Sequence, residues 1–218
     1  MKIALTLLFA LSGIGFAAQA QDTTGDAARG AKINASCTGC HGITGYQSSF
    51  PQVYRVPAIS GQNAKYIVGA LEAYKKGERK HPTMHAMAQT LTERDIADLA
   101  AFYSQQGAGQ AAATSATLPA PSPEVAALLT KGACASCHGE RFNQPIDGSY
   151  PKIGGQYADY LFAALTSYKV EDKPYVGRGN AIMAAQVKQF SNKELKAIAQ
   201  YLGSLPADVH TVAQSEFR

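Results

Sequence analysis

Apolar residues recur at helical spacing in two stretches of the chain, residues 64–76 and 158–169. In both stretches an apolar side chain returns every three or four positions: Ile67, Leu71 and Tyr74 in the first, and Leu161, Leu165 and Tyr168 in the second. This spacing places the apolar side chains on one face of a helix that packs against a core. We therefore expect one amphipathic helix in each stretch.

One further helix is predicted before each of these stretches, and one after it. A short helix should begin near Asp26 and another near Pro123, because proline suits the first turn of a helix. A last helix is expected over 92–104 and again over 191–202, where TERD and SNKE place an acidic residue three positions after a Thr or Ser cap, the second as a regular capping box. No stretch is convincing as a strand, so the predicted fold class is all-α.

These elements repeat in order along the chain. CTGCHG at Cys37 recurs as CASCHG at Cys134, PAISGQ at Pro57 as PKIGGQ at Pro151, and the segment from Met84 as that from Met183, with offsets of 97, 94 and 99 residues. Similar offsets in one order indicate a tandem duplication. We expect domains at 21–106 and 123–206, an Ala/Pro-rich linker at 107–122 and a tail at 207–218.

The first twenty residues have the layout of a signal peptide. Lys2 precedes an apolar run, and Ala18-Gln19-Ala20 offers small residues for cleavage after about Ala20. We therefore expect export to a compartment such as the periplasm, with no membrane-spanning segment later in the chain. The formal net charge of +4 is too small to favour nucleic acid as a partner.

The chemistry is indicated by Cys37, Cys40 and His41 and by their repeat Cys134, Cys137 and His138. These two Cys-x-x-Cys-His motifs contain all four cysteines. A disulfide in each motif would close a very small loop and leave the repeated histidine unexplained. A four-cysteine zinc site needs its two pairs much closer in sequence, and a redox dithiol is expected near a βαβ pattern. Covalent attachment of a c-type haem explains every residue of the motif, with the histidine as an axial ligand of the iron.

Methionines supply a candidate for the opposite axial ligand. Met84 and Met183 hold equivalent places in the two copies, and we expect both in a loop before the last helix. A methionine is more often a flexible core residue, but the equivalent placement favours ligation. His81, His85 and Met87 are neighbours of Met84, and of these His85 is the reserve candidate.

The chain resembles the two-haem cytochrome c4 family, in which each half is similar to a small class I cytochrome c domain. The likeness rests on CTGCHG and CASCHG, on VPAISGQ and YPKIGGQ, and on the matched methionine segments. It implies that the carbonyls of Pro57 and Pro151 accept the Nδ1–H of the proximal histidines. It also implies that Gly30 packs against Phe102, with Ala127 and Tyr201 in the corresponding places of the second copy.

Two haems with both axial positions filled by the protein exchange electrons and leave no site for a small-molecule substrate at the iron. The resemblance implies a respiratory role between a redox-protein donor and an acceptor such as a terminal oxidase, including membrane-bound complexes. A dihaem subunit of a larger dehydrogenase, for example a flavocytochrome, and a dihaem peroxidase remain alternatives. The basic cluster Lys75, Lys76, Arg79 and Lys80 is interpreted as a solvated helix end, with a docking patch for an acidic partner as the sharper hypothesis.

Overall fold

The computed structural model describes residues 24–106 and 117–213. The expected signal peptide, most of the linker and the last residues of the tail lie outside the described residues. Within the described ranges, no helix has the length and apolar character needed to cross a membrane.

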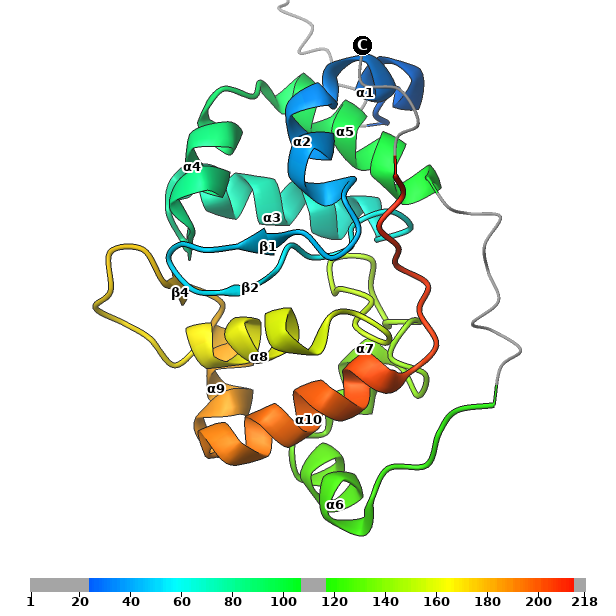
Figure 1. The fold of residues 1–218 in the computed structure, drawn as a ribbon, viewed down its shortest axis with the longest axis vertical. Coiled ribbons are helices and arrows are strands. Elements are labelled where there is room, and N and C mark those ends of the chain that lie inside the picture. The colour runs from blue at the N-terminus through cyan, green and yellow to red at the C-terminus, as the bar shows by residue number, and fades with distance from the viewer. Residues whose placement is uncertain (1–23, 107–116, 214–218) are drawn as a thin grey trace, which may run out of the picture.

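In the part of the chain that the structure describes, each half contains five helices (Figure 1). In the first half these are α1 (Ala27–Ile33), α2 (Ala35–His41), α3 (Ala64–Lys76), α4 (Pro82–Gln89) and α5 (Glu93–Gln105). In the second half they are α6 (Pro123–Lys131), α7 (Cys134–His138), α8 (Ala158–Ser167), α9 (Ala181–Lys188) and α10 (Asn192–Ser204). The all-α prediction is confirmed.

The starts of the last helices follow from side-chain capping. The Thr92 and Ser191 side chains each accept a hydrogen bond from the backbone N–H three residues on, and the Asp95 and Glu194 carboxylates accept one from the backbone N–H of the cap residue. A capping box is therefore present in both halves, which fixes where α5 and α10 begin.

Four strands of two residues each were not visible in the hydrophobic pattern. β1 (Gln47–Ser48) pairs with β2 (Tyr54–Arg55) inside the first half, and β3 (Arg79–Lys80) pairs with β4 (Gly177–Arg178) between the halves, both antiparallel. Strands this short carry no detectable period, because alternation needs several residues to show.

The first and last helices of the first half cross at Gly30. A Cβ atom on Gly30 would lie 2.2 Å from the Asp98 carbonyl oxygen and 2.7 Å from the Phe102 Cβ, so only glycine fits there. The expected pairing of Gly30 with Phe102 is present. Its counterpart is not: Ala127 is exposed, and Leu128 is the residue that α6 buries. With a side chain at the glycine position, the second half crosses its helices through a different residue.

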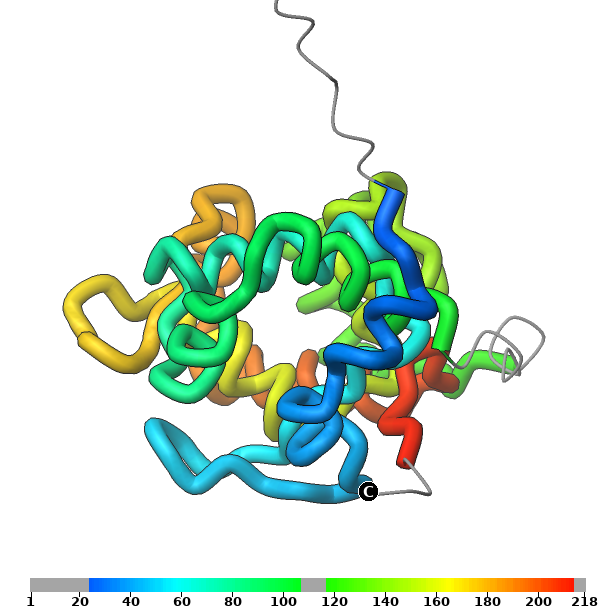
Figure 2. The backbone as a smooth tube through the Cα atoms, turned by 90° about the horizontal axis from the view of Figure 1, so that it is seen from above, coloured from blue at the N-terminus to red at the C-terminus, as the bar shows by residue number. Residues whose placement is uncertain are grey.

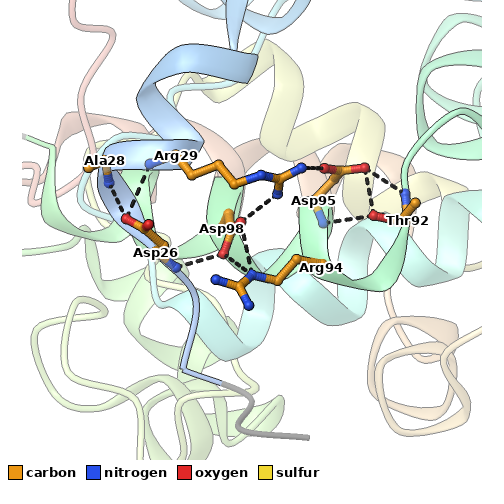
Figure 3. Close-up of polar contacts among 7 residues, drawn as sticks. All are labelled: Asp26, Ala28, Arg29, Thr92, Arg94, Asp95 and Asp98. Atoms are coloured by element: carbon orange, nitrogen blue, oxygen red, sulfur yellow. Dashed lines mark hydrogen bonds and ion pairs between the residues drawn. The ribbon is translucent and has the colours of Figure 1, made fainter.

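A polar network ties α1 to α5 at this crossing (Figure 3). The Asp98 carboxylate is fully buried and accepts hydrogen bonds from the Asp26 N–H at 2.6 Å, Arg29 Nη1 at 2.5 Å and Arg94 Nε at 3.0 Å. Arg29 also pairs with Asp95. The second half instead relies on a larger apolar cluster, which includes Leu128, Phe142, Leu161, Phe190 and Leu202.

The two halves lie against each other, and the end of the chain returns to the first half (Figure 1). His210 exchanges two backbone hydrogen bonds with Ser60, at 3.1 and 2.8 Å, and Val209 is buried. The described part of the expected tail therefore helps to join the halves. Seen from above, the helices of the two halves run around a common centre (Figure 2).

Candidate functional site

A cavity of about 530 Å³ occupies the interior and is lined by residues of both halves. Its lining includes Cys37, Cys40, His41 and Met84 from the first half and His138 and Met183 from the second. Pro57 and Pro151 line the same mostly apolar space, whereas Cys134 and Cys137, the cysteines of the second motif, are not among its lining residues. Apolar walls with a few placed polar groups are typical of a cofactor site.

The motif cysteines lie on α2 and α7, with the histidine as the last residue of each helix. All four thiols are free, so neither motif forms a disulfide. Burial raises the pKa of the Cys37 and Cys134 thiols. The cysteines therefore remain available in pairs, as attachment to two vinyl groups of a haem requires.

Each motif histidine is held by the carbonyl of a proline. The distance from His41 Nδ1 to the Pro57 oxygen is 2.9 Å, and from His138 Nδ1 to the Pro151 oxygen 3.0 Å. Because a carbonyl oxygen only accepts, Nδ1 carries the proton in both rings and Nε2 keeps its lone pair. Burial also lowers the pKa of both histidines, which keeps them neutral. A neutral imidazole with a free Nε2 is the form that binds a metal.

Met84 and Met183 lie on short helices, not in the expected loops. Each is the third residue of its helix, and its N–H donates to the cap side chain: Met84 to His81 Nδ1 at 3.4 Å, and Met183 to Asn180 Oδ1 at 2.9 Å. Pro82 and the Asn180 cap start these helices. Both methionines line the cavity, in equivalent places.

His85, the reserve candidate for the ligand, contacts a backbone carbonyl and does not line the cavity. His85 Nδ1 lies 2.6 Å from the Tyr74 carbonyl oxygen, and His85 is absent from the residues that line the cavity. His81 does line the cavity, but its ring caps α4. Met87, the remaining neighbour, also lines the cavity but is 39% exposed, and it is Met84, not Met87, that matches Met183 in the second half.

Two arginines that sequence reasoning did not assign to the site line the cavity between the halves. Arg79 and Arg178 pair across β3 and β4, and both donate to the Tyr160 hydroxyl, at 2.8 and 3.2 Å. Arg79 also lies 4.6 Å over the Tyr74 ring. Neither guanidinium has a carboxylate partner among residues 24–106 and 117–213, and Arg79 Nε is buried without a hydrogen-bond partner.

These unbalanced positive charges act on the tyrosine between them. Burial alone would raise the pKa of Tyr160, yet Arg178 and Arg79 outweigh it and lower that pKa to about 7. Two lining guanidinium groups without a carboxylate partner in the described residues suit a ligand with carboxylates. The propionate groups of haem meet this requirement.

The basic cluster of residues 75–81 is divided between two places: Lys75 and Lys76 are exposed in the last turn of α3, as expected of a solvated helix end, and Arg79 and Lys80 are not. Arg79 faces the cavity, and Lys80 Nζ donates to the carbonyls of Glu171 at 3.4 Å and Lys173 at 2.8 Å in the other half. Lys75 Nζ donates to the Leu91 carbonyl at 2.5 Å. Arg79 and Lys80 thus join the halves, because β3 pairs with β4, and both readings of the cluster were wrong for them.

Comparison with known proteins agrees with the motifs and the fold. The family model described as Cytochrome c matches residues 27–106 and again 123–206. Cytochrome c4 of Azotobacter vinelandii is 31% identical over 221 residues, covering 94% of this chain and 99% of the relative. The solved structure of Acidithiobacillus ferrooxidans cytochrome c4 is 29% identical, with a TM-score of 0.61, and covers 79% of this chain and 100% of that one.

A relative with another name is similar over a smaller share of the chain. The thiosulfate dehydrogenase electron acceptor of Thiomonas intermedia (strain K12) is 28% identical over 186 residues, 79% of each chain. Two matches to one domain model and near-complete coverage by a cytochrome c4 agree with the duplicated Cys-x-x-Cys-His motifs. The chain therefore belongs to the cytochrome c4 family, with two cytochrome c domains and two covalent c-type haems.

Proposed function

We propose that this protein is an exported electron carrier that works in the periplasm. It receives electrons from a respiratory donor and passes them to an acceptor such as a terminal oxidase, through two haems with His/Met ligation. The observation that carries the proposal is the matched placement of a neutral histidine and a methionine in each half, lining one internal cavity.

Bound haem supplies a one-electron couple between ferrous and ferric iron. The residues of this chain do the rest. His41 and His138 would hold the iron through Nε2, and Met84 and Met183 would hold it through their sulfurs. Methionine ligation raises the reduction potential relative to two histidines. The apolar lining keeps water away, which limits the rearrangement that accompanies a change of charge.

Arg79 and Arg178 would hold the haem carboxylates in the middle of the cavity. Their guanidinium groups have donors to spare, because Arg79 Nε has no partner in the described residues. A carboxylate between two arginines is a charge-assisted contact of the strong kind. This role also explains why two cations lie together without an acidic side chain beside them.

Visible spectroscopy and a redox titration of the purified holoprotein test the proposal. We expect two haems per chain, low-spin spectra in both oxidation states, and the weak far-red band of Met-ligated ferric haem. High-spin iron, ready binding of small ligands, or turnover of peroxide would contradict a closed carrier and favour a peroxidase.

A second candidate function is supported by the relative named as a thiosulfate dehydrogenase electron acceptor. In this case the protein serves one dehydrogenase as its dedicated subunit. Purification of the native protein separates the two: a carrier is recovered alone, whereas a dedicated subunit is recovered with its dehydrogenase at a fixed ratio.

A further inference from the structure

The repeated glutamines Gln62 and Gln156 reach across the contact between the halves. Both side chains are buried, at 4% exposure. Gln156 Oε1 accepts from the Ala58 N–H at 3.0 Å, and its Nε2 donates to the Ala58 carbonyl at 2.8 Å. Gln62 does the same in the opposite direction, with Lys152 N–H and carbonyl both at 2.9 Å. Each glutamine therefore satisfies both polar groups of one backbone residue in the other half.

The two backbone residues bound by the glutamines come immediately after the prolines of the site: Ala58 follows Pro57, and Lys152 follows Pro151. The Pro57 carbonyl and the Ala58 N–H are the two ends of one planar peptide group. A continuous chain of hydrogen bonds thus runs from His41 Nδ1–H to the Pro57 oxygen and from the Ala58 N–H to Gln156. The same chain runs from His138 through the Pro151–Lys152 peptide to Gln62.

Tight turns fix the place of each glutamine. Gly61 and Gly155 precede them with φ of 84° and 73°, in the left-handed region that favours glycine. Their N–H groups donate to the carbonyls of Tyr103 and Leu202, both at 2.8 Å. A Cβ atom on Gly61 would lie 2.3 Å from the Asp208 carbonyl oxygen. Each turn is therefore anchored to its own half while its glutamine faces the other.

Hydrogen bonds in such a chain strengthen one another. When the peptide N–H donates to an acceptor, the carbonyl oxygen of the same peptide becomes more negative and accepts more strongly. A stronger acceptor at Nδ1 raises the basicity of the imidazole as a metal ligand. A more basic ligand favours the ferric state and lowers the reduction potential.

We propose that Gln62 and Gln156 are crossed positioning residues: each orients and polarises the peptide that holds the proximal histidine of the opposite half, and so lowers the potential of the haem there. The proposal rests on the proposed function only in taking His41 and His138 as iron ligands. The potential of each haem would thus depend on a glutamine that belongs to the other domain.

Gln62→Met and Gln156→Met in the holoprotein test this directly. Methionine has a similar volume but no strong acceptor. Spectroelectrochemical titration gives both midpoint potentials, and NMR of the ferrous protein gives the rate at which each proximal ring N–H exchanges with deuterium. Met84→His, added to each background, lowers the first-half potential and so identifies that haem.

Gln156→Met should raise the first-half potential and speed exchange at His41, with the second haem unchanged. Gln62→Met should raise the second-half potential and speed exchange at His138, with the first haem unchanged. The matched control is Asn63→Ala, which removes the neighbouring contact from Asn63 Nδ2 to the Tyr150 carbonyl at 3.0 Å and leaves the hydrogen bonds of the Pro57–Ala58 and Pro151–Lys152 peptides in place. This control should leave both potentials and both exchange rates at their parent values.

Glutamate variants keep the proposal testable if a methionine variant fails to load haem. Gln156→Glu and Gln62→Glu retain an oxygen acceptor, so the opposite potential should stay at or below the parent value. A rise of the opposite potential in the glutamate variants would overturn the proposal. In the methionine variants, a shift in the glutamine's own half, equal shifts in both haems, or no shift of the opposite haem would overturn it as well. Failure of the proposed function itself would show separately, as high-spin or ligand-binding iron in the parent protein.

Discussion

Replacing Asp98 by asparagine removes the charge at the α1–α5 crossing but keeps the size and shape of the side chain. The carboxylate has no exposed surface and accepts from one backbone N–H and two guanidinium groups. Breaking a buried ion pair from one side typically costs about 3–5 kcal/mol. The Arg29 and Arg94 side chains are 41% and 62% exposed and regain water, so we expect a loss of about 2–3 kcal/mol.

Guanidinium chloride unfolding of the holoprotein, followed by circular dichroism, measures this loss. The control is Glu93→Gln, which makes the same charge change at an exposed position of the same helix. Ala197 takes the place of Asp98 in the second repeat, so only the transition of the first half should move. Two-domain proteins need not unfold in one step, and the comparison is therefore made on that transition.

The pH dependence gives a second check on the same residue. Burial would raise the pKa of Asp98, but hydrogen bonds from Arg29 and the Asp26 N–H outweigh it and hold that pKa below its ordinary value. A carboxylate with a lowered folded-state pKa stabilises the fold above its unfolded value and loses this contribution as the pH falls. The gap between parent and Asp98→Asn should thus be full at pH 7 and shrink below about pH 4. A neutral-pH difference between Asp98→Asn and Glu93→Gln of less than about 0.5 kcal/mol would refute the reasoning.

Three further outcomes are expected at the haem sites. Met183→His should lower the second-half potential and abolish its far-red band, and Met87→Leu should leave the first-half potential and far-red band unchanged, as a titration with visible spectra would show. Arg79→Gln should lower both potentials by an amount on the order of 1 kcal/mol, because a cation near the haem carboxylates disfavours ferric iron. The control is Arg55→Gln, which should have a smaller effect because the charge of Arg55 is already paired with Asp159. Equal shifts in the two variants would contradict the assignment of Arg79 to the haem carboxylates. His85→Ala should leave the Soret and far-red bands intact, and loss of either would make it the ligand.

Elements governed by local sequence were predicted well. The helix expected over residues 64–76 has those bounds as α3, because its apolar period and Gly77, left-handed at φ 76°, define it locally. The helices that carry Met84 and Met183 were missed, although Pro82 and Asn180 are recognisable start signals.

Contacts between the halves could not be predicted in the same way. Arg79 looks like one more cation at a helix end until Tyr160, 81 residues away, is found beside it. Gln62 and Gln156 were recognised as matching positions of the repeat, but a match does not say what a residue touches. Their role depends on how one domain docks on the other, and no local pattern encodes that arrangement.

The reciprocal glutamine contacts also describe how the molecule is assembled. Lys152 holds the repeat position of Ala58, and Gln156 that of Gln62, so each contact is made twice with the partners exchanged. A self-complementary interface of this kind is what two copies of a single domain form in a symmetric dimer. Because the domains share one chain, the association is intramolecular and dilution cannot reverse it. The two redox centres thus remain one particle at any protein concentration.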